Sequence, residues 1–151
     1  MFQTAALPVG AWVSYKVAMV LEDGTSQMEG TEKLTVLEVN DTQSLVEDVQ
    51  THDGKSVAQQ DWQDSNVIIS AEMGQMFIDR CTTPEIGGSL ETVTISAGTF
   101  NTCKIGDDIQ AAWVGAVNFG FIKMFSRGKV ADANGKEVPV LMTGEYTASG
   151  N

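Results

Sequence analysis

Sequence signals for tight turns recur along this chain, and the segments between them have the length of single strands in β-hairpins. The clearest are the dipeptides Asp23-Gly24, Asn40-Asp41, Asp53-Gly54 and Asn134-Gly135. Between them, apolar and polar residues alternate with the period of two that is typical of half-buried strands. Parallel strands need a crossover of about a dozen residues or more, so strands joined this closely must pair antiparallel.

The turns predict a single mainly β (α+β) domain over residues 1–151, with about 8–10 strands. An antiparallel sheet of this length must curl to bury one face, which gives a barrel, half-barrel or sandwich. We therefore expect a strongly curved antiparallel sheet or half-barrel, with one or two short helices packed on its concave side. A cavity between helix and sheet would follow, because large apolar side chains then line a concave surface.

The first two strands carry enough pattern to predict their register. Trp12 to Leu21 alternates without interruption, and Thr25 to Val39 follows the Asp-Gly turn. Pairing outward from that turn sets Met19 against Met28. The apolar phase of the second strand changes at Leu37, and a one-residue phase slip of this kind predicts a β-bulge.

The next two hairpins differ in character. Ser44–Thr51 and the short polar limb Ser56–Gln60 flank the Asp53-Gly54 turn, and both limbs indicate a weakly buried or edge part of the sheet. Glu91–Ile105 alternates on both sides of a break, which predicts a tight hairpin in which Gly98 supplies a positive φ.

The C-terminal third predicts three more strands. We place a turn at Arg127-Gly128, and Pro139, which lacks a donor, at a non-pairing or edge position. The strands themselves are Ile109–Val117, Phe119–Ser126 and Val138–Tyr146.

The middle of the chain carries the weakest pattern. The β-branched run Val67-Ile68-Ile69 favours a short strand. Ser70 is a suitable N-cap for a following helix, in which Met73 and Phe77 share a face at i, i+4 spacing. Gly74 weakens that helix by about 1 kcal/mol relative to Ala.

Charge and hydropathy narrow the classes of partner. The formal net charge is −11, which disfavours nucleic acids and anionic lipid headgroups because both need neutralising cations. No apolar run approaches the ~20 residues of a transmembrane helix, so we expect no transmembrane segment. The first residues, MFQTAALPVG, show no signal-peptide pattern. We therefore expect either a cytosolic protein or a mature form to which Met1 was added.

The tests for catalytic and metal chemistry are negative. The single histidine, His52, lies at a hairpin tip, which is a poor platform for a nucleophilic triad, and one histidine with two distant cysteines matches no zinc spacing. Asp132–Glu137 fits a turn better than a calcium loop. No glycine-rich phosphate-binding motif is present in the sequence. We expect no cofactor and no enzymatic activity.

Cys81 and Cys103 leave two alternatives open. In an oxidising compartment, a disulfide that closes the intervening loop would contribute about 3 kcal/mol to stability. In the cytosol, the same residues would be two small buried hydrophobes. We favour the disulfide, which in turn favours the periplasm or cell envelope over the cytoplasm.

The segment Glu91–Ile105, ETVTISAGTFNTCKI, resembles a recurring hairpin of small bacterial envelope proteins with the LolA/LolB-like lipoprotein-localisation fold. The usual form is E-x-V-T-V-P-A-G-T-F-x-x-x-K, and this chain carries Ala97–Phe100 and Lys104, with Ser96 where proline is common. The resemblance implies a strongly curved antiparallel sheet covered by helices, enclosing an apolar cavity. Relatives of that fold bind lipoprotein acyl chains or other lipids in the periplasm, but the motif is structural and transfers no ligand-contacting residue.

Our leading hypothesis is a non-catalytic envelope protein that binds an apolar ligand, such as a lipid or a lipoprotein acyl chain, in the cavity of the curved sheet. Flexible thioethers suit such a cavity wall, although methionines also fill ordinary cores. The alternative is a protein–protein interaction module of an envelope assembly with a filled core, and an uncharacterised enzyme ranks third. The candidate ligand-binding residues are Val17, Met19, Met73, Met76, Phe77, Phe121 and Met124.

Overall fold

The computed structural model describes residues 6–22 and 27–151. In this part of the chain, one antiparallel sheet of nine strands is accompanied by a 3-10 turn, η1 (Ser65–Val67), and one short helix, α1 (Ala71–Asp79). The strands are β1 (Trp12–Leu21), β2 (Gln27–Val39), β3 (Gln43–His52), β4 (Lys55–Asp64), β5 (Ser89–Ile95), β6 (Gly98–Gly106), β7 (Gln110–Val114), β8 (Phe121–Ala131) and β9 (Glu137–Gly150).

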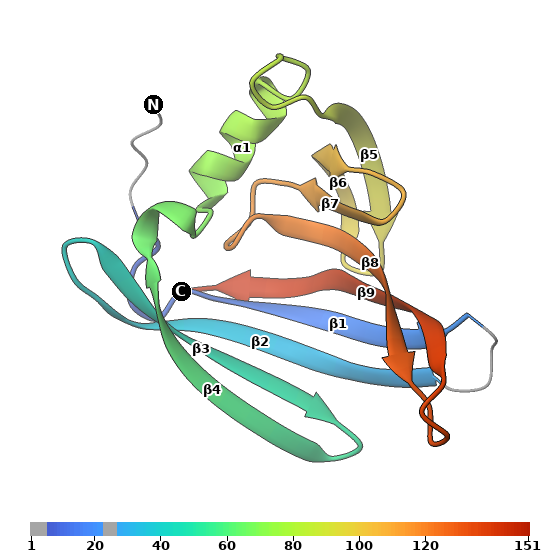
Figure 1. The fold of residues 1–151 in the computed structure, drawn as a ribbon. Coiled ribbons are helices and arrows are strands. Elements are labelled where there is room, and N and C mark those ends of the chain that lie inside the picture. The colour runs from blue at the N-terminus through green and yellow to red at the C-terminus, as the bar shows by residue number, and fades with distance from the viewer. Residues whose placement is uncertain (1–5, 23–26) are drawn as a thin grey trace.

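The sheet consists of two runs of consecutive strands joined by the first and last strands of the chain. Its order is β4-β3-β2-β1-β9-β8-β7-β6-β5, and every neighbouring pair is antiparallel. In Figure 1 the two runs lie on either side of the β1–β9 pair, with α1 beside β6 and β7. The predicted antiparallel sheet of about 8–10 strands is therefore confirmed.

The predicted strong curvature is wrong. The edge strands β4 and β5 lie at opposite ends of the order, and the sheet is not strongly curled. Burial does not require the sheet to close on itself, because segments outside it cover part of one face. Leu7, Ile68 and Phe119 pack against Val13 and Tyr15 of β1 in the larger hydrophobic core.

The register of the first hairpin follows the sequence prediction. Met19 pairs with Met28, and the register of β2 against β3 shifts between Val36 and Glu38, which confirms the bulge expected at Leu37. The predicted Asp23-Gly24 turn lies outside the described residues.

Two further hairpins confirm their predicted turns. Asp53 (φ 53°) and Gly54 (φ 73°) connect β3 to β4, as a type I′ turn requires. β4 is an edge strand, as expected, but it continues to Asp64 and is longer than its polar sequence indicated. In the β5–β6 hairpin, Ile95 pairs with Gly98, whose φ is 141°.

Residues 67–69 form no strand in the structure, contrary to prediction. The chain leaves the sheet after β4, and the Asp64 carboxylate accepts a hydrogen bond from the Asn66 amide (2.9 Å), which starts the 3-10 turn. Ile68 instead enters the core. Of the three β-branched residues, Ile68 is buried, Ile69 is half-buried and Val67 is exposed, so burial of Ile68 in the core and not strand pairing accounts for this part of the run.

Of the two predicted C-terminal turns, Asn134-Gly135 is confirmed between β8 and β9, where Gly135 has a φ of 77°, and Arg127-Gly128 is wrong. Gly128 pairs with Val140, so β8 continues through the expected Arg127-Gly128 turn to its end at Ala131. Pro139 lies in β9 and pairs with Lys129 of β8, but it is one residue beyond the register of β9 with β1, which ends at Val140, so it has the non-pairing position that was predicted on that side. Its carbonyl accepts from the Glu22 amide (3.0 Å), so this contact needs no N–H from the proline.

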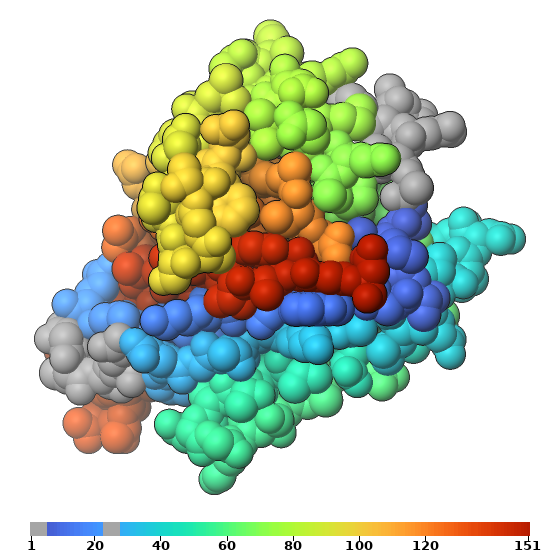
Figure 2. Space-filling view, turned by 180° about the vertical axis from the view of Figure 1, so that it is seen from behind, coloured from blue at the N-terminus to red at the C-terminus, as the bar shows by residue number. Residues whose placement is uncertain are grey.

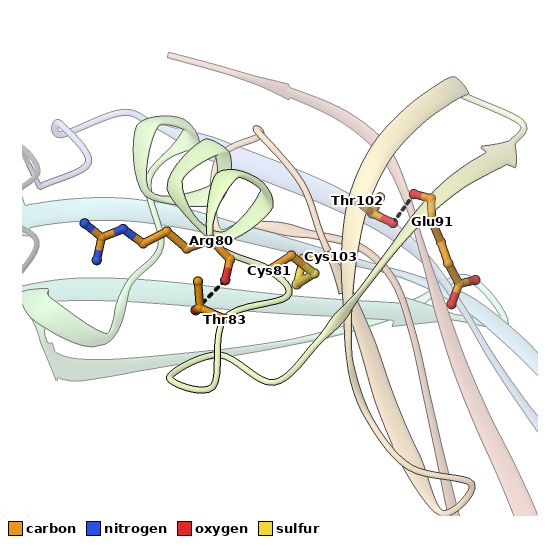
Figure 3. Close-up of a disulfide and its surroundings, with 6 residues drawn as sticks. All are labelled: Arg80, Cys81, Thr83, Glu91, Thr102 and Cys103. Atoms are coloured by element: carbon orange, nitrogen blue, oxygen red, sulfur yellow. Dashed lines mark hydrogen bonds between the residues drawn. A yellow bond between two sulfur atoms is a disulfide. The ribbon is translucent and has the colours of Figure 1, made fainter.

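Helix α1 begins where the sequence predicted and is fastened to the sheet at its far end. Ser70 Oγ accepts from the Met73 amide (3.2 Å), an N-cap bond. Past the helix, Cys81 and Cys103 form the predicted disulfide, which joins this segment to β6 (Figure 3). Both cysteines are buried.

A second hydrophobic cluster packs around the β5–β8 run. Its buried members include Val93, Trp113 and Ile122. The rings of Phe100 on β6 and Tyr146 on β9 meet edge-on with centroids 5.6 Å apart. The back view shows β5 and β6 beside β9 (Figure 2), so this end of the strand order also packs against a central strand.

Candidate functional site

One face of the sheet carries an open groove of about 690 Å³. Residues of β1, β2, β3, β6, β7, β8 and β9 line it, so both runs of strands contribute. The volume falls within the range of small-molecule binding sites. Side chains at directly paired positions share a face of a sheet. The strand register therefore resolves the groove face into three cross-strand rows.

The floor row lacks side-chain bulk in the middle of the sheet. Val17 of β1 pairs with Gly30 on one side and Gly144 on the other. Further along the same row, Met124 pairs with Gly144 and with Ala112. Two glycines and an alanine leave the depression that larger residues would fill.

The methionine row runs beside the floor row and forms the rim. Met19 of β1 pairs with Met28 of β2 and with Met142 of β9. Met28 is 39% exposed and Met142 is 45% exposed, so this rim presents thioethers to solvent. Methionine adapts its shape to irregular apolar surfaces, so an exposed row of thioethers suits apolar ligands of variable shape.

The polar row lies on the other side of the floor row. Glu32 pairs with Gln50 on β3 and with Tyr15 on β1, which in turn pairs with Tyr146. Gln50 Nε2 donates to Glu32 Oε2 (2.9 Å). Asp48 is on the same strand face as Gln50, two residues earlier along β3.

Burial and crowding perturb the acids of the polar row. Desolvation raises the pKa of Glu32, and the neighbouring Asp48 carboxylate raises it further. Two ionised carboxylates are both acceptors, so Glu32 and Asp48 can hydrogen-bond to each other only through a shared proton. Asp48 Oδ1 is buried and has no hydrogen-bond partner among the described residues.

Tyr15 presents a second unsatisfied group at the same place. Its side chain is 1% exposed, and its hydroxyl has no hydrogen-bond partner among the described residues. Burial raises the pKa of this phenol, with a further contribution from the Glu32 carboxylate. A buried hydroxyl without a partner costs free energy. The polar row thus combines an acceptor-rich carboxyl pair with an unpaired hydroxyl.

The seven candidate ligand-binding residues divide between the groove and the helix. Val17, Met19, Phe121 and Met124 line the groove. The other three are on α1, which packs against β6 and β7; they are half-buried there, and none lines the groove. These three are Met73, Met76 and Phe77.

Sequence reasoning missed two parts of the groove. The predicted register already placed Met28 opposite Met19, and the same register would have added Gly30 and Glu32 two and four residues further on. Met142 gave no such signal, because the pairing of β1 with β9 joins segments far apart in the chain.

The remaining chemical features are few. His52 lines the groove near the β3–β4 turn, where the sequence placed it. Within the described ranges, no cluster of three or more histidine, cysteine or acidic side chains is arranged to hold a metal ion. Neither helix that the structure describes has the length and apolar character needed to cross a bilayer.

Comparison of the chain with protein-family models, with curated protein sequences and with solved structures returned no match. The class that the fold defines is therefore a mainly β protein with a nine-stranded antiparallel sheet and one short α-helix over the described residues. The disulfide is consistent with an oxidising, extracytoplasmic compartment.

Proposed function

We propose that this protein is a non-catalytic binding protein of the periplasm or cell envelope that holds an apolar ligand, such as a lipid or a lipoprotein acyl chain, in the groove. The observation that carries the proposal is the groove itself. Its floor lacks bulk at Gly30 and Gly144, and its rim exposes Met28 and Met142. An apolar hollow that remains open to solvent is typical of a ligand site.

The sequence resemblance and the disulfide support the same proposal. The hairpin at Glu91–Ile105 resembles that of the LolA/LolB-like lipoprotein-localisation fold, whose relatives bind acyl chains between a sheet and helices. The Cys81–Cys103 disulfide favours the compartment in which those relatives act. The open sheet differs from the strongly curved form, so we place the ligand on the sheet face rather than inside a closed half-barrel.

A titration with the uncharged fluorescent probe N-phenyl-1-naphthylamine tests this proposal. Ala112 is a small residue of the floor row, between Ile105 and Met124. We expect the wild-type protein to bind the probe at one site, and Ala112→Phe to weaken binding by at least about tenfold by filling the groove.

The matched control is Thr31→Phe, which adds a similar side chain to β2 on the opposite face from Gly30 and Glu32. It should leave probe binding within about twofold of wild type. No saturable binding by the wild-type protein, or equal losses in the two variants, would exclude the groove as the site.

A second candidate function has one observation in its favour. Edge strand β4 is exposed along nearly its whole length, with Val57 at 60% and Trp62 at 42% exposure. Exposed strand edges pair with strands of other chains. An interaction module of an envelope assembly would use this edge, and cross-linking from β4 in an envelope extract, compared with cross-linking from β9, would distinguish it.

A further inference from the structure

The end of the groove at the polar row carries polar and acidic side chains, and the described residues there include no basic lysine or arginine. Glu32 and Gln50 of the polar row line the groove, together with His52. None of the described residues that line it is a lysine or arginine. An anionic head, such as a fatty-acid carboxylate or a phosphate, would meet acidic groups here with no cation to pair with.

We propose that the polar row, with Asp48 behind it, is a headgroup site for a primary ammonium, so that the ligand of the groove is a single-chain amphiphile with an amine head. This inference rests on the proposed function, because it assigns the chemistry of the ligand whose chain occupies the floor row. The chain would lie over Val17 and Gly144, and the head would meet the Glu32 carboxylate.

The ammonium has donors for the acceptors at this end of the groove, where Glu32 lines the wall, and where Tyr15 and Asp48, which each have a buried oxygen atom, do not themselves line it. It carries three N–H donors and no acceptor. Glu32 and Asp48 supply carboxylate acceptors, and the hydroxyl oxygen of Tyr15 supplies another. Asp48 Oδ1 and the Tyr15 hydroxyl are the two buried side-chain polar atoms of the described structure that lack a protein partner.

Electrostatics favour the same occupant. Two carboxyl groups held together in a partly buried site repel when both are ionised, and they must otherwise share a proton. Burial raises the pKa of Glu32 most, and the repulsion from Asp48 raises it further. An ammonium takes the place of the shared proton, so its binding relieves the repulsion as it forms charge-assisted hydrogen bonds.

The strand register supplies a control that distinguishes an effect of this site from an effect of the overall negative charge of the protein. Glu47 is adjacent to Asp48 but pairs with Thr35 and Gln60, so it is on the opposite face of β3. Glu47→Gln therefore removes the same charge as Glu32→Gln without changing the groove. The two variants distinguish a built site from attraction by a net charge of −11.

The test is competition against N-phenyl-1-naphthylamine at pH 7.5 by amphiphiles of equal chain length. We expect dodecylamine to displace the probe at a concentration at least about tenfold lower than dodecanoate, with dodecanol between them. Dodecyltrimethylammonium keeps the charge but has no N–H donor, so it should compete more weakly than dodecylamine. Glu32→Gln and Tyr15→Phe should each reduce the preference for the amine, and Glu47→Gln should retain it.

Each outcome decides between the proposals. If the probe does not bind, both the proposed function and this inference fail. If the probe binds but dodecylamine and dodecanoate compete equally, the groove remains an apolar site and the headgroup assignment alone is wrong. The headgroup assignment is also wrong if Glu47→Gln lowers the amine preference as much as Glu32→Gln, because the preference would then reflect net charge. Circular dichroism of each variant establishes that it is folded.

Discussion

Tyr15 and Tyr146 are neighbours across β1 and β9, but only one of their hydroxyls has a partner. Tyr146 Oη is 2.7 Å from Ser149 Oγ, whereas the hydroxyl of Tyr15 is buried without a hydrogen bond to the described residues. Stability alone does not account for the Tyr15 hydroxyl, since a phenylalanine would fill the same space without the desolvation cost. The ammonium head proposed above would supply the missing partner.

The two tyrosines form a matched pair for mutagenesis. We expect Tyr15→Phe to leave the free energy of unfolding unchanged or to raise it by up to about 1 kcal/mol, because an unpaired buried hydroxyl is removed. Tyr146→Phe should lower it by about 1 kcal/mol through loss of the Ser149 hydrogen bond. Urea denaturation of both variants provides the comparison. A loss for Tyr15→Phe as large as that for Tyr146→Phe would show that its hydroxyl is satisfied in solution.

Glu32 makes a related prediction about pH. Its pKa is raised in the folded protein, so its neutral form favours folding, and that contribution is lost as pH rises from the unfolded value through the folded one. The groups that face it are Asp48 and His52 on β3 and Tyr15 on β1.

Glu32→Gln should therefore be more stable than wild type at pH 8, by a few tenths of a kcal/mol after solvent screening, with no difference near pH 4. Thermal unfolding of the two proteins across this pH range provides the measurement. A variant that is less stable than wild type at pH 8 would mean that the Glu32 carboxylate has a stabilising partner.

At the scale of the elements, the notable feature of α1 is its close approach to the loop that follows β7. From the sequence, Gly74 was only a weak residue in a short helix. In the structure, a Cβ added at Gly74 would collide with the carbonyl oxygen of Gly115 in the loop after β7. The glycine permits the contact between helix and sheet, and this packing outweighs its poor helix propensity.

Gly74→Ala separates the two effects. Helix propensity alone predicts a gain of about 1 kcal/mol, and overpacking against a backbone carbonyl predicts a net loss of about 2 kcal/mol. We expect the loss. Gln75→Ala, at the adjacent exposed position, should change stability by no more than about 0.5 kcal/mol. Stabilisation by Gly74→Ala in chemical denaturation would contradict the close approach.

The elements also show which parts of the fold could be predicted from sequence. The Met19–Met28 register and the bulge at Leu37 follow from local alternation and a nearby turn, so they were predictable. The β1–β9 pairing joins the two ends of the chain, and no local pattern encodes it. The open sheet was missed for a similar reason, because Leu7, Ile68 and Phe119 cover the face from distant segments.

The candidate site was predictable to the extent that strand register was. Val17 and Met19 were expected on one face, and Met124 joined them because its strand alternates in the same way. Met73 and Met76 belong to the predicted site only if the helix covers the cavity, and in the structure neither lines the groove. The polar row could not be foreseen, since it depends on Tyr15 meeting Glu32 on one side and Tyr146 on the other.

At the scale of the whole molecule, the Cys81–Cys103 disulfide fastens the end of the helical segment to the β5–β8 run (Figure 3). Gly88 lies against both sulfur atoms, where an added Cβ would be 2.5 Å from Cys103 Sγ and 2.9 Å from Cys81 Sγ. The neighbouring Thr102 hydroxyl donates to the Glu91 carbonyl (2.8 Å). The bond is therefore part of a tightly packed junction.

Replacing both cysteines by serine should lower the free energy of unfolding by about 3 kcal/mol, as expected for a disulfide that closes a loop of this length. Urea denaturation of the variant and of the reduced wild-type protein provides the measurement, and the two should agree. An unchanged denaturation midpoint in both would mean that the cysteines are not bonded in the native protein.

The proposed ligand lies on the groove face, over the methionine row and the floor row, and not under the helix. Methionine-methyl NMR of protein labelled with ¹³C, titrated with dodecylamine, tests this directly. We predict saturable shift changes for Met19, Met28, Met124 and Met142, with Met73 and Met76 unchanged. Shift changes confined to Met73 and Met76, or none at saturating amine, would contradict it.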